Sequence, residues 1–453
     1  MSGSSGGTRR RRPKLRRKKN GAPCGVEAGE ELREALALVR ERVSAGGADT
    51  LWVEETLKAA ALASAARLLG LFYSKELPAL LGLDAPSGGR GVRNRTVLTT
   101  VGEVTYTRAY TAASGGGHRF PLDEALGITE GCTPAMASMM SWAGARFDSY
   151  DIAGEALGRL AGLEVPGRRV QRMVNTVAER EAAWIAKRAT DKAAGGILNL
   201  QADMTGIPMR PEELVSVKGH DGGDPKKRQI KAGAVFRQEE NADGEIQRIP
   251  DSTTRVVTFD DVTSFSQMLM DEAVRRGYNS ADKVVFTSDG AEWIWLMVAD
   301  RFKGAVEIVD FYHAAEHLGA LCSLAEPDKR KAADLFKKRR RIMLNWGAES
   351  AIRYFMAIPE DHANKKAIED GLGYFINNRK RMRYREFREK GYFIGSGVIE
   401  GTCKCLVNQR TDLGGQRWLR SGSLNVLRIR AAIIDNLHDR YWKTAGKITR
   451  SAA

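Results

Sequence analysis

The chain has 453 residues, 43% hydrophobic and 28% charged, which is the composition of a globular protein with room for two to four domains and excludes a disordered chain. The formal net charge is +15, and residues 9–19 contribute nine basic groups and no acid, so the rest carries 15 − 9 = +6. The five cysteines include no CxxC pair, which argues against disulfides and cysteine-bound metal and for a reducing, cytoplasmic location. Charges interrupt the most apolar window, residues 57–73, which argues against a membrane span.

The first predicted segment is a basic tail, residues 1–25. Its like-charged runs repel one another too strongly to fold, and such runs act as arms on polyanions. A tail that merely aids solubility is the alternative, because the opening MSGSSGG resembles an expression linker. Residues 26–90 follow as a helical region, where apolar residues recur at spacings of three and four over 30–44 and 52–73. We expect these two helices to form a hairpin.

A small β module is predicted over residues 91–132. Residues 95–110 alternate β-branched and polar side chains around Val101 and Gly102, and a glycine cluster follows at 115–117. This alternation around a central glycine predicts a β-hairpin.

Residues 133–192 are predicted to be helical and to resemble a helix-turn-helix. Gly162 separates a second helix, opening near Pro166, from a first helix with four inward-facing apolar residues: Ile152, Ala156, Leu157 and Leu160. The second helix would present polar side chains to a DNA groove, namely Arg168, Arg169, Gln171 and Arg172. An ordinary helical hairpin with a solvated basic face is the alternative.

The stretch 197–203 brings a carboxylate to the predicted end of a strand. Its side chains alternate, so Asp203 lies on the same face as the amides Asn199 and Gln201. A turn is expected over 205–208, which contains threonine, glycine and proline. Asp203 is therefore expected at the edge of a sheet.

Two further acids occupy comparable positions. Asp289 closes an apolar run, and Glu400 follows a Gly-Ser-Gly loop on a helical pattern. Together with Asp203, these carboxylates from three elements predict a divalent-metal site. Acids at such places are also common turn and cap residues, and Asp289 begins a capping-box spacing with Glu292.

The order of elements predicts an α/β fold with an RNase H-like core of mixed sheet, in residues 193–320 and 393–445. After the strand at Asp203, the pattern gives two β-rich runs, 229–237 and 255–259, and then a helix, 264–276. A buried strand, 284–288, leads to Asp289, and a helix containing Trp293 and Trp295 separates it from a last strand, 305–309. In such a sheet the first strand lies next to the fourth. This places Asp203 beside Asp289.

A basic helical insertion is predicted over residues 321–392. Arginine-rich helices interleaved with aromatic residues suit a phosphate backbone and occasional base stacking. The residues expected to contact DNA there are Lys338, Arg339, Arg340, Arg379, Lys380 and Arg381. A merely solvated charged face is the alternative. On the helix that follows, Glu400, Lys404 and Asn408 share a face at four-residue spacing, a stripe that suits a metal next to a phosphodiester.

Residues 313–317, HAAEH, match the H-x-x-E-H signature of inverted zinc peptidases. Zinc proteolysis is therefore a rival function, which requires both histidines on one face of a long helix and a distant third acid. A packed His313 hydrogen-bonded to Asp310 at a strand edge is the structural alternative.

Four motifs, in this order, resemble those of bacterial insertion-sequence DDE transposases of the ISKra type: DMTGIPMR at 203–210, SDGAEWIW at 288–295, DFYHAAEHL at 310–318 and IGSGVIEGTCK at 394–404. The resemblance spans residues 95–435 and implies that Asp203, Asp289 and Glu400 are the catalytic acids. Asp310 and His313 resemble an element of Mutator-like and hAT-like transposases. We expect His313 near the acids but not bound to metal, orienting a phosphate or a base, with Asp310 fixing its tautomer.

The resemblance also implies the reaction and its partners. Lys404, Arg410, Arg417 and Trp418 are expected to bind DNA, the last three because relatives carry amide and arginine-tryptophan residues there. The implied activity is Mg²⁺- or Mn²⁺-dependent cleavage of double-stranded transposon ends and strand transfer into target DNA. A homodimer or larger synaptic assembly would act in the bacterial nucleoid.

One departure from the relatives concerns residues 111–119. Relatives often carry a cysteine-rich zinc ribbon there, whereas this chain reads TAASGGGHR, so no structural zinc is expected. A domesticated DNA-binding protein that does not cleave is the alternative function.

Overall fold

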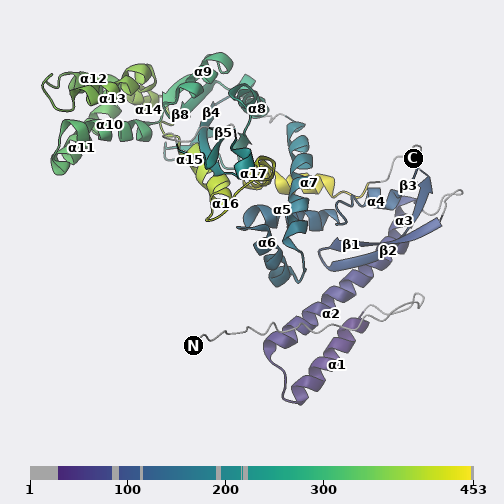
Figure 1. Cartoon of the computed structure of the whole chain (residues 1–453). Coiled ribbons are helices and arrows are strands. Elements are labelled where there is room, and N and C mark those ends of the chain that lie inside the picture. The colour runs from purple at the N-terminus through teal and green to yellow at the C-terminus, as the bar shows by residue number, and fades with distance from the viewer. Residues whose placement is uncertain are drawn as a thin grey trace.

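The computed structural model describes residues 29–83, 91–112, 116–189, 195–215, 217 and 223–449. The predicted basic tail, 1–25, lies outside these residues. The described chain is a mixed α/β protein in which a central mixed sheet is accompanied by many helices (Figure 1). Within the described ranges, no helix combines the length and apolar character that crossing a bilayer requires.

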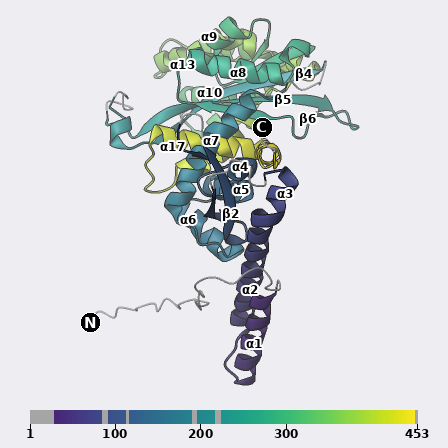
Figure 2. The same cartoon turned by 90° about the vertical axis from the view of Figure 1, so that its right-hand side faces the viewer.

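The N-terminal helices form the expected hairpin, α1 (Glu30–Ser44) and α2 (Thr50–Leu71). Asp49 caps α2 by accepting a hydrogen bond from the Trp52 backbone N–H at 2.8 Å. The chain continues through η1 (Phe72–Glu76) and α3 (Leu77–Leu81). Figure 2 shows the hairpin projecting away from the rest of the molecule.

The predicted β-hairpin is present as β1 (Gly91–Thr99) and β2 (Gly102–Ala112), with the short β3 (His118–Arg119) added to β2. The following helix α4 (Pro121–Ala125) contributes Asp123, whose carboxylate accepts hydrogen bonds from Tyr106 Oη at 2.6 Å and Arg108 Nε at 2.7 Å. This buried polar contact fixes α4 against the hairpin.

The next helices are α5 (Pro134–Arg146), α6 (Tyr150–Ala156), η2 (Leu157–Ala161) and α7 (Gly167–Ala186). The predicted break at Gly162 is confirmed, because this residue ends η2 with φ 74°. Two predicted inward residues are wrong: Ile152 is 45% and Leu160 is 76% exposed. The buried cluster that contains Leu157 instead includes Val170 and Val174 of α7.

These helices do not have a core of their own. Met173 and Val177 of α7 belong to one hydrophobic cluster with Val426 and Ile429 of α17 (Arg420–Ile434) and with Ile207 of the central sheet. The helix-turn-helix-like segment is therefore packed onto the sheet domain rather than tethered beside it.

The central sheet contains β4 (Ile197–Pro208), β5 (Lys227–Glu240), β6 (Ile246–Arg248), β7 (Thr254–Thr258), β8 (Lys283–Ser288) and β9 (Val306–Val309). Its strand order is β6-β5-β4-β8-β9, and β7 also pairs with β5. Strands β4, β5 and β7 are antiparallel neighbours, whereas β8 and β9 run parallel to β4. The predicted neighbourhood of the first strand and the strand before Asp289 is confirmed.

The expected turn after Asp203 is wrong. Strand β4 continues to Pro208, and every residue of it is paired with β5, including Asp203 with Ala232. The missing N–H of Pro208 is tolerated because the residue is the last of the strand. Asp203 therefore lies in the middle of a long strand.

Helices α8 (Val262–Arg275) and α9 (Glu292–Arg301) connect the later strands. The basic region is helical as predicted, and Figure 1 shows it as a lobe beside the sheet, made of α10 (Phe311–Ala325), α11 (Lys329–Trp346), α12 (Ala348–Met356), α13 (Lys365–Asn378) and α14 (Tyr384–Glu389). Its apolar side chains share a cluster with β8 and β9. The chain then returns through α15 (Gly397–Gly401), η7 (Thr402–Asn408) and α16 (Gln409–Thr411) to α17 and α18 (His438–Ala445).

Candidate active site

Three aspartates lie in one row across the sheet. Leu200 and Phe286 are the last pair of the parallel ladder between β4 and β8, and extending this register by three residues brings Asp203 level with Asp289. In the same way, Ser288 pairs with Val309, so Asp289 is level with Asp310. The sheet order thus brings together carboxylates that are far apart in the sequence.

The connections across the row are tight. The Ser288 hydroxyl donates a hydrogen bond to the carbonyl of Ala202, and the Asp310 N–H donates to the Ser288 carbonyl at 2.8 Å. These bonds hold the residues before Asp203 and Asp289 side by side. The two half-buried carboxylates therefore lie close together, Asp203 on β4 and Asp289 directly after β8.

Asp203 has an environment that disfavours its negative charge. Burial raises the pKa of its carboxyl, and the nearby charge of Asp289 contributes further, while hydrogen bonds from Met204 and Cys403 oppose the rise. The Met204 N–H lies 2.6 Å from Oδ1, and Cys403 Sγ lies 3.6 Å from Oδ2. A divalent cation between Asp203 and Asp289 would replace their repulsion by attraction, and carboxylate oxygens are ligands that Mg²⁺ and Mn²⁺ prefer.

Asp289 does not act as the cap of α9. Its Oδ1 accepts a hydrogen bond from the Ala291 N–H at 3.0 Å, but Ala291 is the N-cap and no side chain caps the helix. The predicted capping box with Glu292 is therefore absent. The carboxylate of Asp289 keeps lone pairs that the turn does not use.

The backbone after Asp289 is covered by an aromatic ring from the inserted lobe. A Cβ placed on Gly290 would lie 2.1 Å from Cε2 of Tyr374, which belongs to α13, so this position requires glycine. The Tyr374 ring stacks on His317 at a centroid distance of 3.9 Å. Sequence reasoning missed Tyr374 as a neighbour of Asp289, and Gly290 was the available signal.

Asp310 is a positioning residue. Its Oδ1 accepts the His313 N–H at 2.7 Å and thereby caps α10, while its Oδ2 accepts hydrogen bonds from the Ser396 hydroxyl at 2.6 Å and from the Ser396 N–H. Gln201 supports the same loop, donating to the Gly395 carbonyl at 3.1 Å and accepting the Ile399 N–H at 2.9 Å. Both buried side chains hold the loop that leads into the helix of Glu400.

The expected tautomer contact between Asp310 and His313 is wrong. Asp310 binds the backbone N–H of His313, whereas the imidazole Nδ1 lies 3.5 Å from Glu316 Oε2. The two histidines of the HAAEH segment do share a face, with ring centroids 5.0 Å apart. His317, however, is occupied by its stack with Tyr374.

Glu400 is engaged in an ion pair at the surface. Its Oε1 lies 2.6 Å from Lys404 Nζ, and both side chains are more than 60% exposed. Cys403 is the residue of this helix that contacts Asp203, and burial raises the pKa of its thiol, so it acts as a hydrogen-bond donor. Asn408, the third residue of the predicted stripe, accepts a hydrogen bond from Thr205 Oγ1 at 3.1 Å.

A metal at this site would be held first by Asp203 and Asp289. Glu400 would join them only after leaving Lys404. Among the residues that the structure describes, no group of three or more histidine, cysteine, aspartate or glutamate side chains is arranged to hold a metal ion.

The residues expected to contact DNA divide into three groups: exposed, half-buried and buried. Eight are exposed, although Lys404 is paired with Glu400: Arg168, Arg172, Lys338, Arg340, Arg379, Lys380, Lys404 and Arg417. Three others are half-buried and engaged within the protein. Arg169 donates to the Gly131 carbonyl at 3.4 Å, Arg339 lies over the Tyr354 ring, and Arg381 binds Glu307 at 2.5 Å.

Arg410 and Trp418 are corrections to the expected DNA surface. Arg410 is 1% exposed, and its guanidinium lies 5.3 Å from the Tyr150 ring centroid and 4.9 Å from that of Trp418. Trp418 is also buried and donates from Nε1 to the Thr411 carbonyl at 3.1 Å. These contacts attach the segment that contains Arg410 and Trp418 to Tyr150 at the start of α6.

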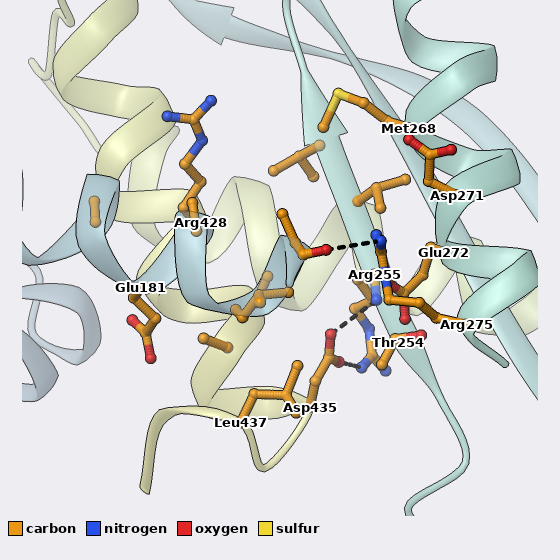
Figure 3. Close-up of a pocket in the computed structure, with 18 residues that line it drawn as sticks. Glu181, Thr254, Arg255, Met268, Asp271, Glu272, Arg275, Arg428, Asp435 and Leu437 are labelled. Atoms are coloured by element: carbon orange, nitrogen blue, oxygen red, sulfur yellow. Dashed lines mark hydrogen bonds and ion pairs between the residues drawn. The ribbon is translucent and has the colours of Figure 1, made fainter. Parts of the chain in front are cut away.

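A separate pocket of about 290 Å³ lies between α7, β7, α8 and the end of α17 (Figure 3). Burial raises the pKa of Asp435 in this pocket to about 7, although Arg255 binds the carboxylate through its backbone N–H at 2.8 Å and its guanidinium. Arg255 Nε also donates to Thr402 Oγ1 at 3.1 Å. The pocket is thus connected to the helix that follows Glu400, but it is not at the aspartate row.

Comparisons with protein-family models and with curated proteins give no match to this chain. Its function is therefore argued from the geometry and chemistry of the site.

Proposed function

We propose that the protein is a DDE transposase of the ISKra type, a metal-dependent enzyme that cleaves transposon ends and joins them to target DNA. The observation that carries the proposal is the proximity of Asp203 on β4 to Asp289, which directly follows the parallel neighbouring strand β8. Two carboxylates on a rigid sheet are suited to hold cations against a phosphodiester.

The sheet order supports an RNase H-like core. Three antiparallel neighbours, β7, β5 and β4, are followed by the parallel strands β8 and β9. The predicted third acid, Glu400, comes after the inserted lobe on a helix that packs against β4. This arrangement agrees with the order of the four sequence motifs.

The residues divide the work of the reaction between them. Asp203 and Asp289 would hold Mg²⁺ or Mn²⁺, and a bound ion would supply activation of water or a 3′-hydroxyl and stabilisation of the leaving oxygen. Asp310 and Gln201 keep the loop before Glu400 in place. If Glu400 turns toward the metal, Lys404 is released to contact a phosphate.

The exposed cations of α7 and α11 provide phosphate contacts on double-stranded DNA. Two transposon ends must be held together, so a homodimer or larger assembly in the bacterial cytoplasm completes the proposal. The ion pair of Glu400 with Lys404 favours one alternative, a DNA-binding protein that does not cleave.

The test is cleavage of DNA that carries the inverted repeats flanking the gene. Asp203→Asn and Asp289→Asn should each abolish Mg²⁺-dependent cleavage while DNA affinity stays near that of the wild type. Asp300→Asn, an exposed aspartate on α9, serves as the matched control and should cleave normally. Cleavage at the wild-type rate by either active-site variant would refute the assignment, and binding without any cleavage by the wild type would favour the alternative.

A further inference from the structure

A second pocket lies between α10 and α11, next to the aspartate row. It has a volume of about 270 Å³ and is lined by Phe311, Phe336, Lys337, Arg340, Arg341 and Leu344. We call it the α10–α11 pocket. Its apolar wall consists of the half-buried Phe336 and Leu344 and of Phe311, which is only 4% exposed, and three cations from one face of α11 lie at its edge.

The three cations are not neutralised by the protein. In the part of the chain that is described, Lys337, Arg340 and Arg341 are exposed and have no carboxylate within ion-pair distance. Arg340 Cζ lies 5.2 Å from the ring centroid of Phe311, which keeps this guanidinium above the apolar wall. The pocket therefore combines an aromatic surface with unpaired positive charge, which is complementary to a flat ring that carries a phosphate.

The position of the pocket connects it to the candidate active site. Phe311 directly follows Asp310, and its N–H donates to the Ile394 carbonyl at 2.9 Å in the loop before Glu400. The next residue, Tyr312, is 62% exposed and has its ring against Gly395. A ligand in the pocket would thus contact the residue that directly follows Asp310 in the aspartate row.

We propose that the α10–α11 pocket receives one unpaired nucleotide of a DNA strand, with the base on Phe336 beside the Arg340 guanidinium and the phosphate on Lys337 and Arg341. The volume is slightly below the ~300–1,000 Å³ of typical small-molecule sites, which suits a single ring system and excludes a paired duplex. The inference rests on the proposed function for the identity of the strand, but binding needs no cleavage.

The test uses full-length protein and a DNA duplex with a single bulged 2-aminopurine, in the absence of divalent metal. The same duplex with a bulged abasic site and a fully paired duplex complete the set. The wild type should change the 2-aminopurine fluorescence and bind the base-containing bulge about tenfold or more tightly than the abasic one, because stacking on an aromatic side chain contributes that much. Equal affinity for the two bulges would overturn the proposal.

Variants separate the wall from the cations. Phe336→Leu keeps an apolar side chain of similar bulk and should remove most of the preference for the base. Lys337→Gln combined with Arg341→Gln should weaken both bulged duplexes about equally. Lys366→Gln, an exposed lysine on α13, is the matched control and should change neither. Retention of the full preference in Phe336→Leu would contradict the ring contact.

Two further measurements distinguish the sources and the hypotheses. Free deoxyadenosine monophosphate should fail to displace the bulged duplex at concentrations comparable to the duplex; efficient displacement would assign the pocket to a free nucleotide instead. Mg²⁺-dependent cleavage is measured in parallel. Cleavage without base preference refutes the pocket and leaves the enzyme, whereas base preference without cleavage refutes the enzyme and leaves the pocket.

Discussion

At the scale of single residues, neighbouring aspartates have different roles because their hydrogen bonds differ. Asp310 is buried and its oxygens are used by Ser396 and His313, so it supports the loop rather than the chemistry. Asp203 and Asp289 each accept one short-range backbone bond and retain unused lone pairs. The environment of each carboxylate, and not its residue type, determines which of them can hold a cation.

Asp435 provides a prediction about pH. Burial raises its pKa from the ordinary value of 3.8 to about 7, so between these pH values the folded protein holds a proton that the unfolded chain releases. The stability contributed by Asp435 is thus fully present below pH 3.8 and is lost as pH rises through about 7, by at most ~1.4 kcal/mol per pH unit. Asp435→Asn should remove this dependence.

The measurement is urea unfolding of the wild type and Asp435→Asn across that pH range. As pH rises, the unfolding free energy of the wild type should fall relative to that of Asp435→Asn. Parallel pH profiles for the two proteins would show that Asp435 stays ionised throughout.

At the scale of elements, the inserted lobe packs against the end of β8 through an aromatic side chain. Tyr374 of α13 lies on the backbone of Gly290 and stacks on His317 of α10. Since Gly290 follows Asp289, the position of the lobe and the position of this carboxylate are linked. The buried hydroxyl of Tyr374 has no hydrogen-bond partner among the described residues, so the ring and not the hydroxyl makes the contact.

Gly290→Ala tests that link. The added Cβ would overlap the Tyr374 ring, and overpacking of this kind costs about 1–3 kcal/mol, so we expect lower stability and slower cleavage. Gly373→Ala is the matched control, because a Cβ there meets nothing within 4 Å and removing a helical glycine should stabilise α13 by about 0.5–1 kcal/mol.

Thermal unfolding and a cleavage assay measure both variants. Tyr374→Leu combined with Gly290→Ala should recover part of the lost stability, because the smaller side chain vacates the space. If the changes in unfolding free energy of the two single substitutions simply add in the double variant, the added Cβ of Gly290→Ala does not clash with the Tyr374 ring.

At the scale of the whole molecule, basic residues are divided between surface and core. Arg168 and Arg172 on α7 are exposed, whereas Arg410 is enclosed between Tyr150 and Trp418, and burial lowers the pKa of its guanidinium. The net charge of the chain therefore overstates the positive surface that DNA can reach. Only exposed cations exchange condensed counterions for protein contacts.

The salt dependence of DNA affinity distinguishes these groups. If Arg168 and Arg172 each contact a phosphate, as proposed, Arg168→Gln with Arg172→Gln should reduce the slope of log affinity against log salt by about 1.8, at ~0.9 per contact. Arg410→Met should leave the slope unchanged and instead alter the unfolding free energy. If the α7 double variant keeps the wild-type slope, α7 does not contact the DNA backbone; a reduced slope in Arg410→Met would contradict its structural role.

The sequence by itself determined the elements and the neighbourhood of the first two acids. Alternating and 3.6-residue patterns placed the helices of the N-terminal hairpin, the β-hairpin and the main strands. The order of strands and helices then brought Asp203 next to Asp289, because parallel strands joined by helices leave few allowed topologies. Both inferences depend on local pattern and chain connectivity, which a sequence contains.

Tertiary structure alone decided how each side chain is used. The periodic pattern could not show that Arg410 and Trp418 are buried, that Glu400 pairs with Lys404, or that Tyr374 lies on Gly290. The predicted turn after Asp203 failed for the same reason, since pairing along β5 overrides the turn preference of Thr205 to Pro208. Exposure, ion pairing and strand length depend on contacts between segments distant in the chain, and a local sequence pattern does not specify those contacts.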